Sequence, residues 1–167
     1  MAVRKTLWYR RFRTAAYVNA LGTILWTIAI VLPFAPFSYL QPIMVGGGPG
    51  TWFLVGYLLY PIIGVGGFAS IASFLFMIET YELRNLNHGI MLTGLILLFV
   101  GVLAGCVLLG VAGAIGGYTL VIQHSTVNFT QSLLSPYVDP ITAASLVAVA
   151  GAGVLMYGMA TAKATKT

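Results

Sequence analysis

Two long apolar segments joined by a short polar hinge constrain this chain more than any other feature. The segments cover about residues 52–78 and 90–118, and the hinge covers residues 79–89. A helix of about 20 apolar residues crosses the hydrocarbon core of a bilayer, so each segment is long enough to cross once. The sequence therefore predicts a transmembrane helical hairpin in the middle of the chain.

The composition requires the rest of the chain to be in the membrane as well. Hydrophobic residues make up 59% of the 167 residues, charged residues only 7%, and the mean hydropathy is +0.97. Soluble domains usually carry about 25% charged residues, so this chain cannot cover a water-exposed surface. We expect one all-α integral membrane domain over residues 1–167, with no room for a sizeable soluble domain.

Two further apolar segments, about residues 15–32 and 140–160, complete a predicted set of four transmembrane helices. Pro33 ends the first of them, and Asp139 followed by Pro140 is a typical helix start. Residues 33–51 and 119–139 are then outer loops. The second loop begins with a partial alternation of apolar residues that is compatible with a short strand.

One threonine and one proline are informative about the second helix. Thr51 is a suitable N-cap residue for it, and Pro61 predicts a kink about one-third of the way along. The first outer loop, before Thr51, contains no charge and is rich in aromatic and aliphatic residues. We expect this loop to lie in the membrane interface or beneath a neighbouring protein.

The basic residues predict the topology. All eight Lys and Arg lie near the two ends of the chain or, in the case of Arg84, in the hinge. With four spans, these parts share one side, which the positive-inside rule assigns to the cytoplasm. We predict a multi-pass protein of the cell membrane with cytoplasmic termini that attract anionic lipid headgroups. No other basic patch exists, so nucleic-acid binding is not expected.

Small residues recur along the helices at spacings that allow close packing. The small-xxx-small pattern lets membrane helices approach backbone to backbone. The predicted packing positions are Gly64, Gly67, Gly101, Gly105, Gly113, Gly117, Ala144, Ala148 and Ala152.

Asn19, Thr23 and Thr27 are spaced at i, i+4 and i+8, which places them on one face of the first helix. Polar groups in hydrocarbon need partners, so this face should meet another helix. We interpret it as a hydrogen-bonded packing seam, with a lining for a polar ligand as the alternative.

Few residues are candidates for chemistry, and the centres of the four spans contain no ionisable acid or base. Glu79, Glu82 and His88 in the hinge are weak candidates for proton handling or ligand binding. His124 is a weak metal-ligand candidate, with Asp139 as the one other donor of its loop. Asn128 begins a glycosylation sequon in the same loop. Cys106 is the sole cysteine, and no cofactor is expected.

The leading hypothesis is a non-catalytic accessory subunit packed among other integral membrane subunits, with a respiratory or redox assembly as one host class. The alternative is a small homo-oligomeric transporter or a lipid- or quinone-binding membrane protein. A third hypothesis, a metal-assisted enzyme, depends on His124 or His88. A small multidrug exporter would need an acid in the first span. That span has no acid and contains the amide Asn19 instead.

Overall fold

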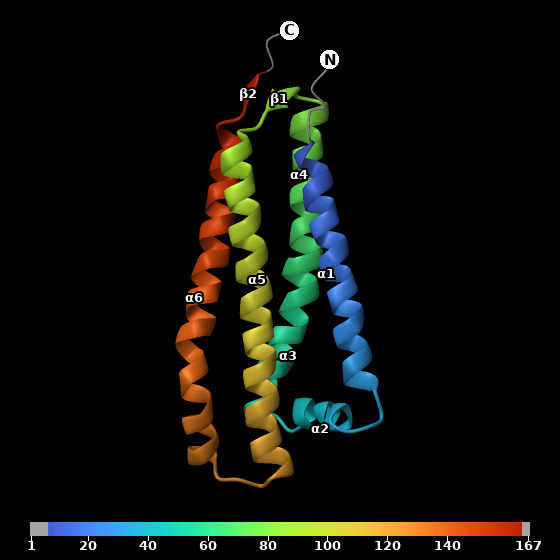
Figure 1. Ribbon diagram of the computed structural model, residues 1–167, viewed down its shortest axis with the longest axis vertical. Helices are drawn as coiled ribbons and strands as arrows, with labels where there is room; N and C mark the ends of the chain where they lie inside the picture. Colours follow the sequence, from blue (N-terminus) through green and yellow to red (C-terminus); the bar gives the residue numbers. More distant parts are fainter. Residues whose placement is uncertain (1–6, 165–167) are drawn as a thin grey trace.

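The computed structural model describes residues 7–164, and about 85% of the structure is helical. In this part of the chain, four helical units are long and apolar enough to cross a membrane: Trp8–Val31, Gly50–Thr80, His88–Ile122 and Val127–Ala160. They run along the long axis of the molecule (Figure 1). This confirms the predicted all-α class and the predicted number of apolar helices of spanning length.

Two of the units change helix type along their length. The first and last units are single helices, α1 (Trp8–Val31) and α6 (Val127–Ala160). The second consists of α3 (Gly50–Leu59), the π-helix η2 (Tyr60–Gly67) and α4 (Phe68–Thr80). The third consists of α5 (His88–Gly117) and the π-helix η3 (Tyr118–Ile122).

Pro61 lies at the point where the second unit becomes a π-helix. Proline has no backbone N–H and its ring clashes with the preceding turn, so the regular α-helical ladder cannot continue through it. The sequence predicts a kink at Pro61, and the structure contains the π-helix η2 at this position. The two halves of the unit also have different neighbours, because α3 packs on α5 whereas α4 packs on α1.

The four units form two helix pairs that the second unit joins. The largest interface is between α5 and α6, and the second pair is α1 with α4. Phe12 and Phe68 are fully buried in the α1–α4 pair, with ring centroids 6.0 Å apart. Leu155 of α6 is buried against α5, where Gly94 faces it. Among the described helices, α6 packs mainly on α5.

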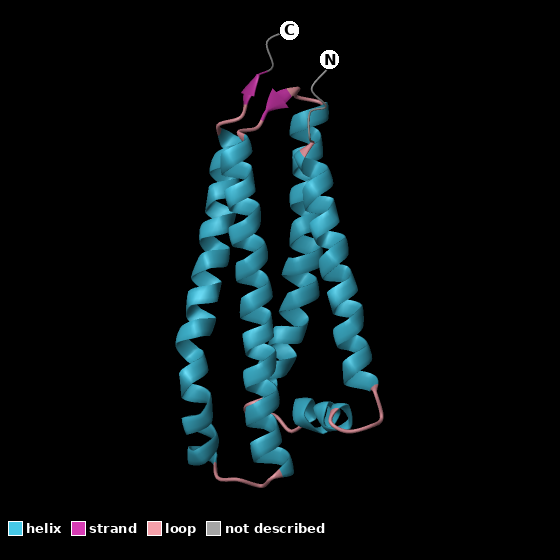
Figure 2. Ribbon diagram, in the orientation of Figure 1, coloured by secondary structure: helices cyan, strands magenta, loops and turns pink. Residues whose placement is uncertain are grey.

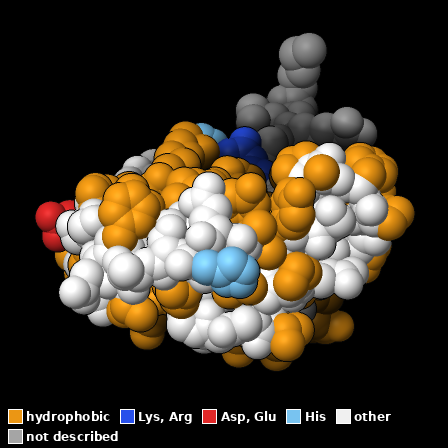
Figure 3. All heavy atoms as spheres, turned by 90° about the horizontal axis from the view of Figure 1, so that it is seen from below, with side chains coloured by type: hydrophobic (Ala, Val, Ile, Leu, Met, Phe, Trp, Pro, Cys, Tyr) orange, Lys and Arg blue, Asp and Glu red, His pale blue; other side chains and the backbone are white. Residues whose placement is uncertain are grey.

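The two chain termini and the hinge lie at the same end of the molecule (Figures 1 and 2). Here β1 (Arg84–Asn85) pairs antiparallel with β2 (Lys163–Ala164), with Arg84 opposite Ala164. The hinge is shorter than the predicted residues 79–89, because α4 extends to Thr80 and α5 begins at His88. Figure 3 shows the opposite end, which is covered mostly by hydrophobic and uncharged side chains.

The predicted start of the fourth helix is wrong. Helix α6 begins at Val127 and continues through Pro136 and Pro140, so Asp139 is an exposed residue inside the helix. Thr126 is the N-cap and accepts a hydrogen bond from the N–H of Phe129 at 3.4 Å. Proline is tolerated in membrane helices because local adjustments and neighbouring groups satisfy the freed backbone carbonyls. Residues 127–139 are therefore helical and not loop.

The first turns of α6 are held by tertiary contacts that sequence periodicity does not reveal. Thr130 and Leu134 are buried, and Leu134 lies against Gly116 of α5. The short strand suggested for the start of this loop is also absent, because residues 118–122 continue the third unit as η3. The remaining connection covers only residues 123–126.

Residues 33–51 contain helical structure that was predicted as loop. The 3-10 helix η1 (Phe37–Tyr39) leads into α2 (Leu40–Val45), which lies across the end of the bundle (Figure 1). Ile43 is 1% exposed and contacts Gly117, so this segment packs on the chain itself. The second unit then begins at Gly50 and not with Thr51 as an N-cap, since Pro49 precedes the helix.

Candidate functional site

The polar face of α1 meets the π-helix beside Pro61. Asn19 is 1% exposed, and its Nδ2 donates a hydrogen bond to the backbone carbonyl of Gly64 at 2.8 Å. A Cβ atom on Gly64 would lie 3.2 Å from the Asn19 side chain. The absence of a side chain at Gly64 thus lets a buried amide reach the backbone of the neighbouring helix.

The two threonines of this face differ in what they contact. The Thr23 hydroxyl donates to the carbonyl of Asn19 at 2.9 Å, within its own helix. Thr27 donates to the Thr23 carbonyl at 2.8 Å, and its hydroxyl also lies 2.9 Å from that of Tyr57 in α3. Asn19 and Thr27 therefore contact the second unit, whereas the Thr23 hydroxyl is occupied inside α1.

Substitution of Asn19 by leucine is expected to lower the free energy of unfolding by about 1–2 kcal/mol, because an interhelical hydrogen bond in the bilayer is lost. Thr23→Val should change it by less than about 0.5 kcal/mol, since that hydroxyl only bonds its own helix. Both values can be measured by SDS titration in mixed micelles, followed by circular dichroism. Equal losses for the two variants would contradict a seam carried by Asn19.

Trp26 is the centre of an aromatic cluster that joins α1 to the second unit. Its ring centroid lies 5.9 Å from that of Phe53, 6.0 Å from Tyr57 and 5.9 Å from Tyr60. On the other side, a Cβ atom on Gly110 would lie 2.6 Å from Cζ2 of Trp26. The indole therefore occupies space that Gly110 leaves open on α5.

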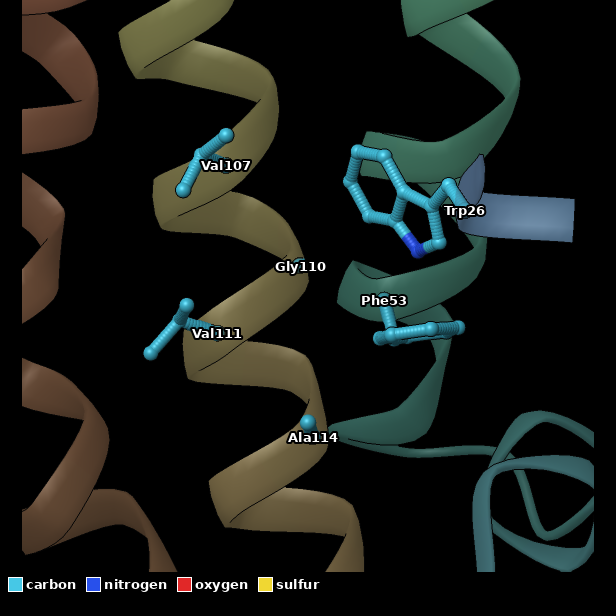
Figure 4. A pocket seen from close by; sticks show the side chains of 6 residues that line it. All are labelled: Trp26, Phe53, Val107, Gly110, Val111 and Ala114. Atoms are coloured by element: carbon cyan, nitrogen blue, oxygen red, sulfur yellow. The ribbon is translucent and has the colours of Figure 1, made fainter. Parts of the chain in front are cut away.

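An apolar pocket of about 260 Å³ adjoins this indole (Figure 4). In the close-up, the rings of Trp26 and Phe53 lie on one side and α5 on the other. Its lining consists of Trp26, Phe53, Val107, Gly110, Val111 and Ala114. The residues supply van der Waals surface and an indole N–H, so the pocket suits an apolar chain rather than a charged group.

This aromatic cluster was not predicted from the sequence. Phe53, Tyr57 and Tyr60 are spaced at i, i+4 and i+7, which places three aromatic rings on one helical face. That spacing was the available signal. Gly110, by contrast, is one of many glycines in its helix, and nothing in the local pattern marks it as the position opposite a tryptophan.

Most of the predicted packing positions face another element. Gly101 lies against the backbone of Ala148, which brings α5 and α6 together. A Cβ atom on Gly105 would lie 3.8 Å from the Cβ of Ala144. Gly113 lies against the backbone of Phe53, and Gly117 against Ile43. Ala152 packs at the edge of the buried core.

Gly67 is different, because a Cβ atom there would meet only Ile63 of its own helix, at 3.7 Å. Other close approaches were not singled out from the sequence. Gly56 faces the backbone carbonyl of Cys106, Gly94 faces Leu155, and Gly151 faces the backbone at Leu98. Their small-residue spacing resembles that of many other positions, so only the helix pairing distinguishes them.

The hinge acids are occupied by structural contacts. The Glu79 carboxylate accepts hydrogen bonds from the backbone N–H groups of Trp8 at 2.9 Å and of Tyr9 at 3.1 Å. It therefore caps the start of α1, which has no side-chain cap of its own, and its charge complements the helix dipole. Glu82 pairs with Arg84 at 2.9 Å. The exposed His88 ring lies 5.1 Å from that of Trp8.

The predicted candidate residues at the other end of the molecule do not form a metal site with other described residues. His124 is exposed, with a φ of +53°, in the connection between η3 and α6. Within residues 7–164, no group of three or more His, Cys, Asp or Glu side chains could hold a metal ion. Asn128 is exposed in the first turn of α6, and Cys106 is buried between helices.

Comparison with known proteins adds no functional information. No protein-family model and no curated protein matches the sequence, and no solved structure matches the fold.

Proposed function

We propose that this protein is a non-catalytic packing subunit of a larger integral membrane assembly. The observation that carries the proposal is the open arrangement of the helices. Helix α6 packs mainly on α5, and large side chains on its other faces, such as Leu146, Val149 and Met156, are 65–69% exposed. A helix with one main neighbour leaves its other faces free to contact lipid or another subunit.

Two glycines support contact with another protein at such faces. Gly153 of α6 is exposed, and a Cβ atom there would meet nothing within 4 Å. Gly66 is also exposed, and its nearest neighbour is the Pro61 carbonyl at 3.9 Å. Glycine costs about 1 kcal/mol relative to alanine in a helix, and neither position has a packing role inside the chain. A close helix contact from another chain would explain both.

The charged groups fit the same proposal. Glu79 and Glu82 are engaged by the α1 backbone and by Arg84, which suits a role in the architecture rather than in catalysis.

We further propose that the end carrying both termini is cytoplasmic in the cell membrane. The support for this is the excess of arginine and lysine at that end, which the positive-inside rule associates with the cytoplasm.

The test is to solubilise membranes that contain the native protein in a mild detergent and to measure the mass of the particle by light scattering. The proposal expects a particle well above the chain mass of 17.8 kDa that contains other membrane proteins. Gly153→Leu should weaken this assembly, whereas Thr93→Leu, at an exposed position of α5, should leave it intact. A stable lone monomer would refute the proposal.

A homo-oligomeric lipid- or quinone-binding protein is the second candidate. The apolar pocket beside Trp26 favours it, because an isoprenoid or acyl chain could enter between α1 and α5 there. The same mass measurement separates the two candidates. A particle made only of copies of this chain would support the second and contradict the first.

A further inference from the structure

A groove of about 730 Å³ is lined by residues of α1, η2 and α4 and by Tyr81. The start of α1 and the end of α4 lie at the end of the molecule that carries both termini (Figure 1). The inner part of the groove is lined by small and apolar residues, among them Val65, Ala69 and Ala72. Its outer part is lined by Tyr9, Arg13 and Tyr81. The groove is thus apolar toward the middle of the membrane and aromatic and basic toward the end of the bundle.

Among the described residues, no carboxylate forms an ion pair with the arginines beside this groove. The guanidinium groups of Arg10 and Arg13 lie over the Tyr9 ring, 5.8 and 5.9 Å from its centroid. Within residues 7–164, the one ion pair between side chains joins Arg84 to Glu82. Glu79, the one acid of α4, accepts hydrogen bonds from the start of α1. Arg13 is exposed beside this groove, and it has no carboxylate partner in the part of the chain that the structure describes.

The groove also has the length of one lipid leaflet. Val65 lies in η2, and Tyr81 directly follows α4 sixteen positions further along the chain, which corresponds to about 24 Å at 1.5 Å per residue. Half of a bilayer core measures about 15 Å, and the headgroup region adds several more. Its volume lies within the range of about 300–1,000 Å³ that is usual for small-molecule sites.

We propose that this groove is a specific site for an anionic phospholipid. The phosphate binds the guanidinium of Arg13, with Arg10 adding positive charge, and an acyl chain lies along Ala69 and Val65. Arginine is suited to this task because its planar guanidinium donates two parallel hydrogen bonds to one phosphate. Basic and aromatic side chains together are also typical of the headgroup zone.

Native mass spectrometry of the delipidated full chain, after incubation with phosphatidylglycerol or phosphatidylcholine, tests the site. We expect one phosphatidylglycerol to remain bound and phosphatidylcholine to be retained much less. Arg13→Gln should weaken phosphatidylglycerol binding about tenfold, since a charge-assisted hydrogen bond is lost. Ala69→Trp, at an exposed position inside the groove, should abolish binding by filling the space for the acyl chain.

The matched control is Arg11→Gln, which removes the same charge from the same helix. Arg11 lies over Trp8, with its guanidinium carbon 4.4 Å from the ring centroid, and does not line the groove. This variant should keep its phosphatidylglycerol. Equal losses for the Arg11 and Arg13 variants would show nonspecific attraction to the basic end and overturn the proposal. Absence of bound phosphatidylglycerol in the parent chain would overturn it as well. Circular dichroism of each variant verifies that the helices are intact.

Discussion

Gly151→Ala is expected to lower the free energy of unfolding by about 1–3 kcal/mol, the usual cost of overpacking a close contact. The added Cβ would lie 2.9 Å from the backbone Cα of Leu98. A backbone cannot rotate away as a flexible side chain can, so α5 and α6 must move apart along their shared interface. SDS titration of the purified protein in mixed micelles, with helicity as the readout, measures the loss.

Gly153→Ala is the matched control, two residues further along the same helix. A Cβ atom there meets nothing within 4 Å, so stability should stay unchanged or rise by up to about 1 kcal/mol through helix propensity. Gly105→Ala should also be tolerated, because its nearest neighbour would be Ala144 at 3.8 Å. If Gly151→Ala proved as harmless as Gly153→Ala, the α5–α6 pairing described above would be wrong.

Trp26→Ala is expected to lower the free energy of unfolding by about 2–4 kcal/mol, the magnitude typical of large-to-small changes in a packed site. The indole contacts three aromatic rings of the second unit and fills the space opposite Gly110 of α5. Lipid tails are as apolar as the protein interior, so the loss comes mainly from van der Waals packing. The same titration provides the measurement.

Trp52→Ala is the control for the tryptophan substitution. Trp52 lies in the first turn of α3 and has no aromatic ring contact among the described residues. Its replacement should therefore cost less than about 1 kcal/mol. Equal costs for both tryptophans would mean that the effect of Trp26→Ala reflects membrane anchoring and not the contact between α1, α3 and α5.

The number and class of the helices could be predicted because they depend on composition alone. A segment without charges that is long enough to cross a bilayer must satisfy its backbone hydrogen bonds internally, and a helix does so without any partner. This is why the central hairpin was predicted close to its observed position. The first helix was predicted over about residues 15–32, and α1 ends near there at Val31 but begins earlier, at Trp8. Proline chemistry predicted a kink at Pro61, and the structure contains a π-helix there.

The fourth helix shows where such reasoning fails. Asp139 and Pro140 form a strong local signal for a helix start, yet α6 begins at Val127. The signal is outweighed by contacts with residues distant in sequence, in particular the burial of Thr130 and Leu134. Burial of this kind depends on where α5 lies, and a local pattern contains no information about that position.

The candidate site was also predicted only in part from the sequence. The spacing of Asn19, Thr23 and Thr27 predicted a polar face, but only the tertiary structure shows that Asn19 reaches the Gly64 carbonyl while the Thr23 hydroxyl is occupied within α1. Likewise, the sequence marked Glu79 as a weak candidate for proton handling or ligand binding, whereas the fold places its carboxylate against the N–H of Trp8, 71 residues away in sequence.

That this chain forms apolar helices of spanning length follows from the sequence, because hydrophobicity and backbone hydrogen bonding act along each segment separately. The sequence also places the basic residues at the ends and in the hinge. The tertiary structure alone decided which helices pair, which glycines must remain glycine and where the open groove lies. The physical reason is that close packing is a property of two surfaces in contact, and lipid offers no competing force that would select the partner from one surface alone.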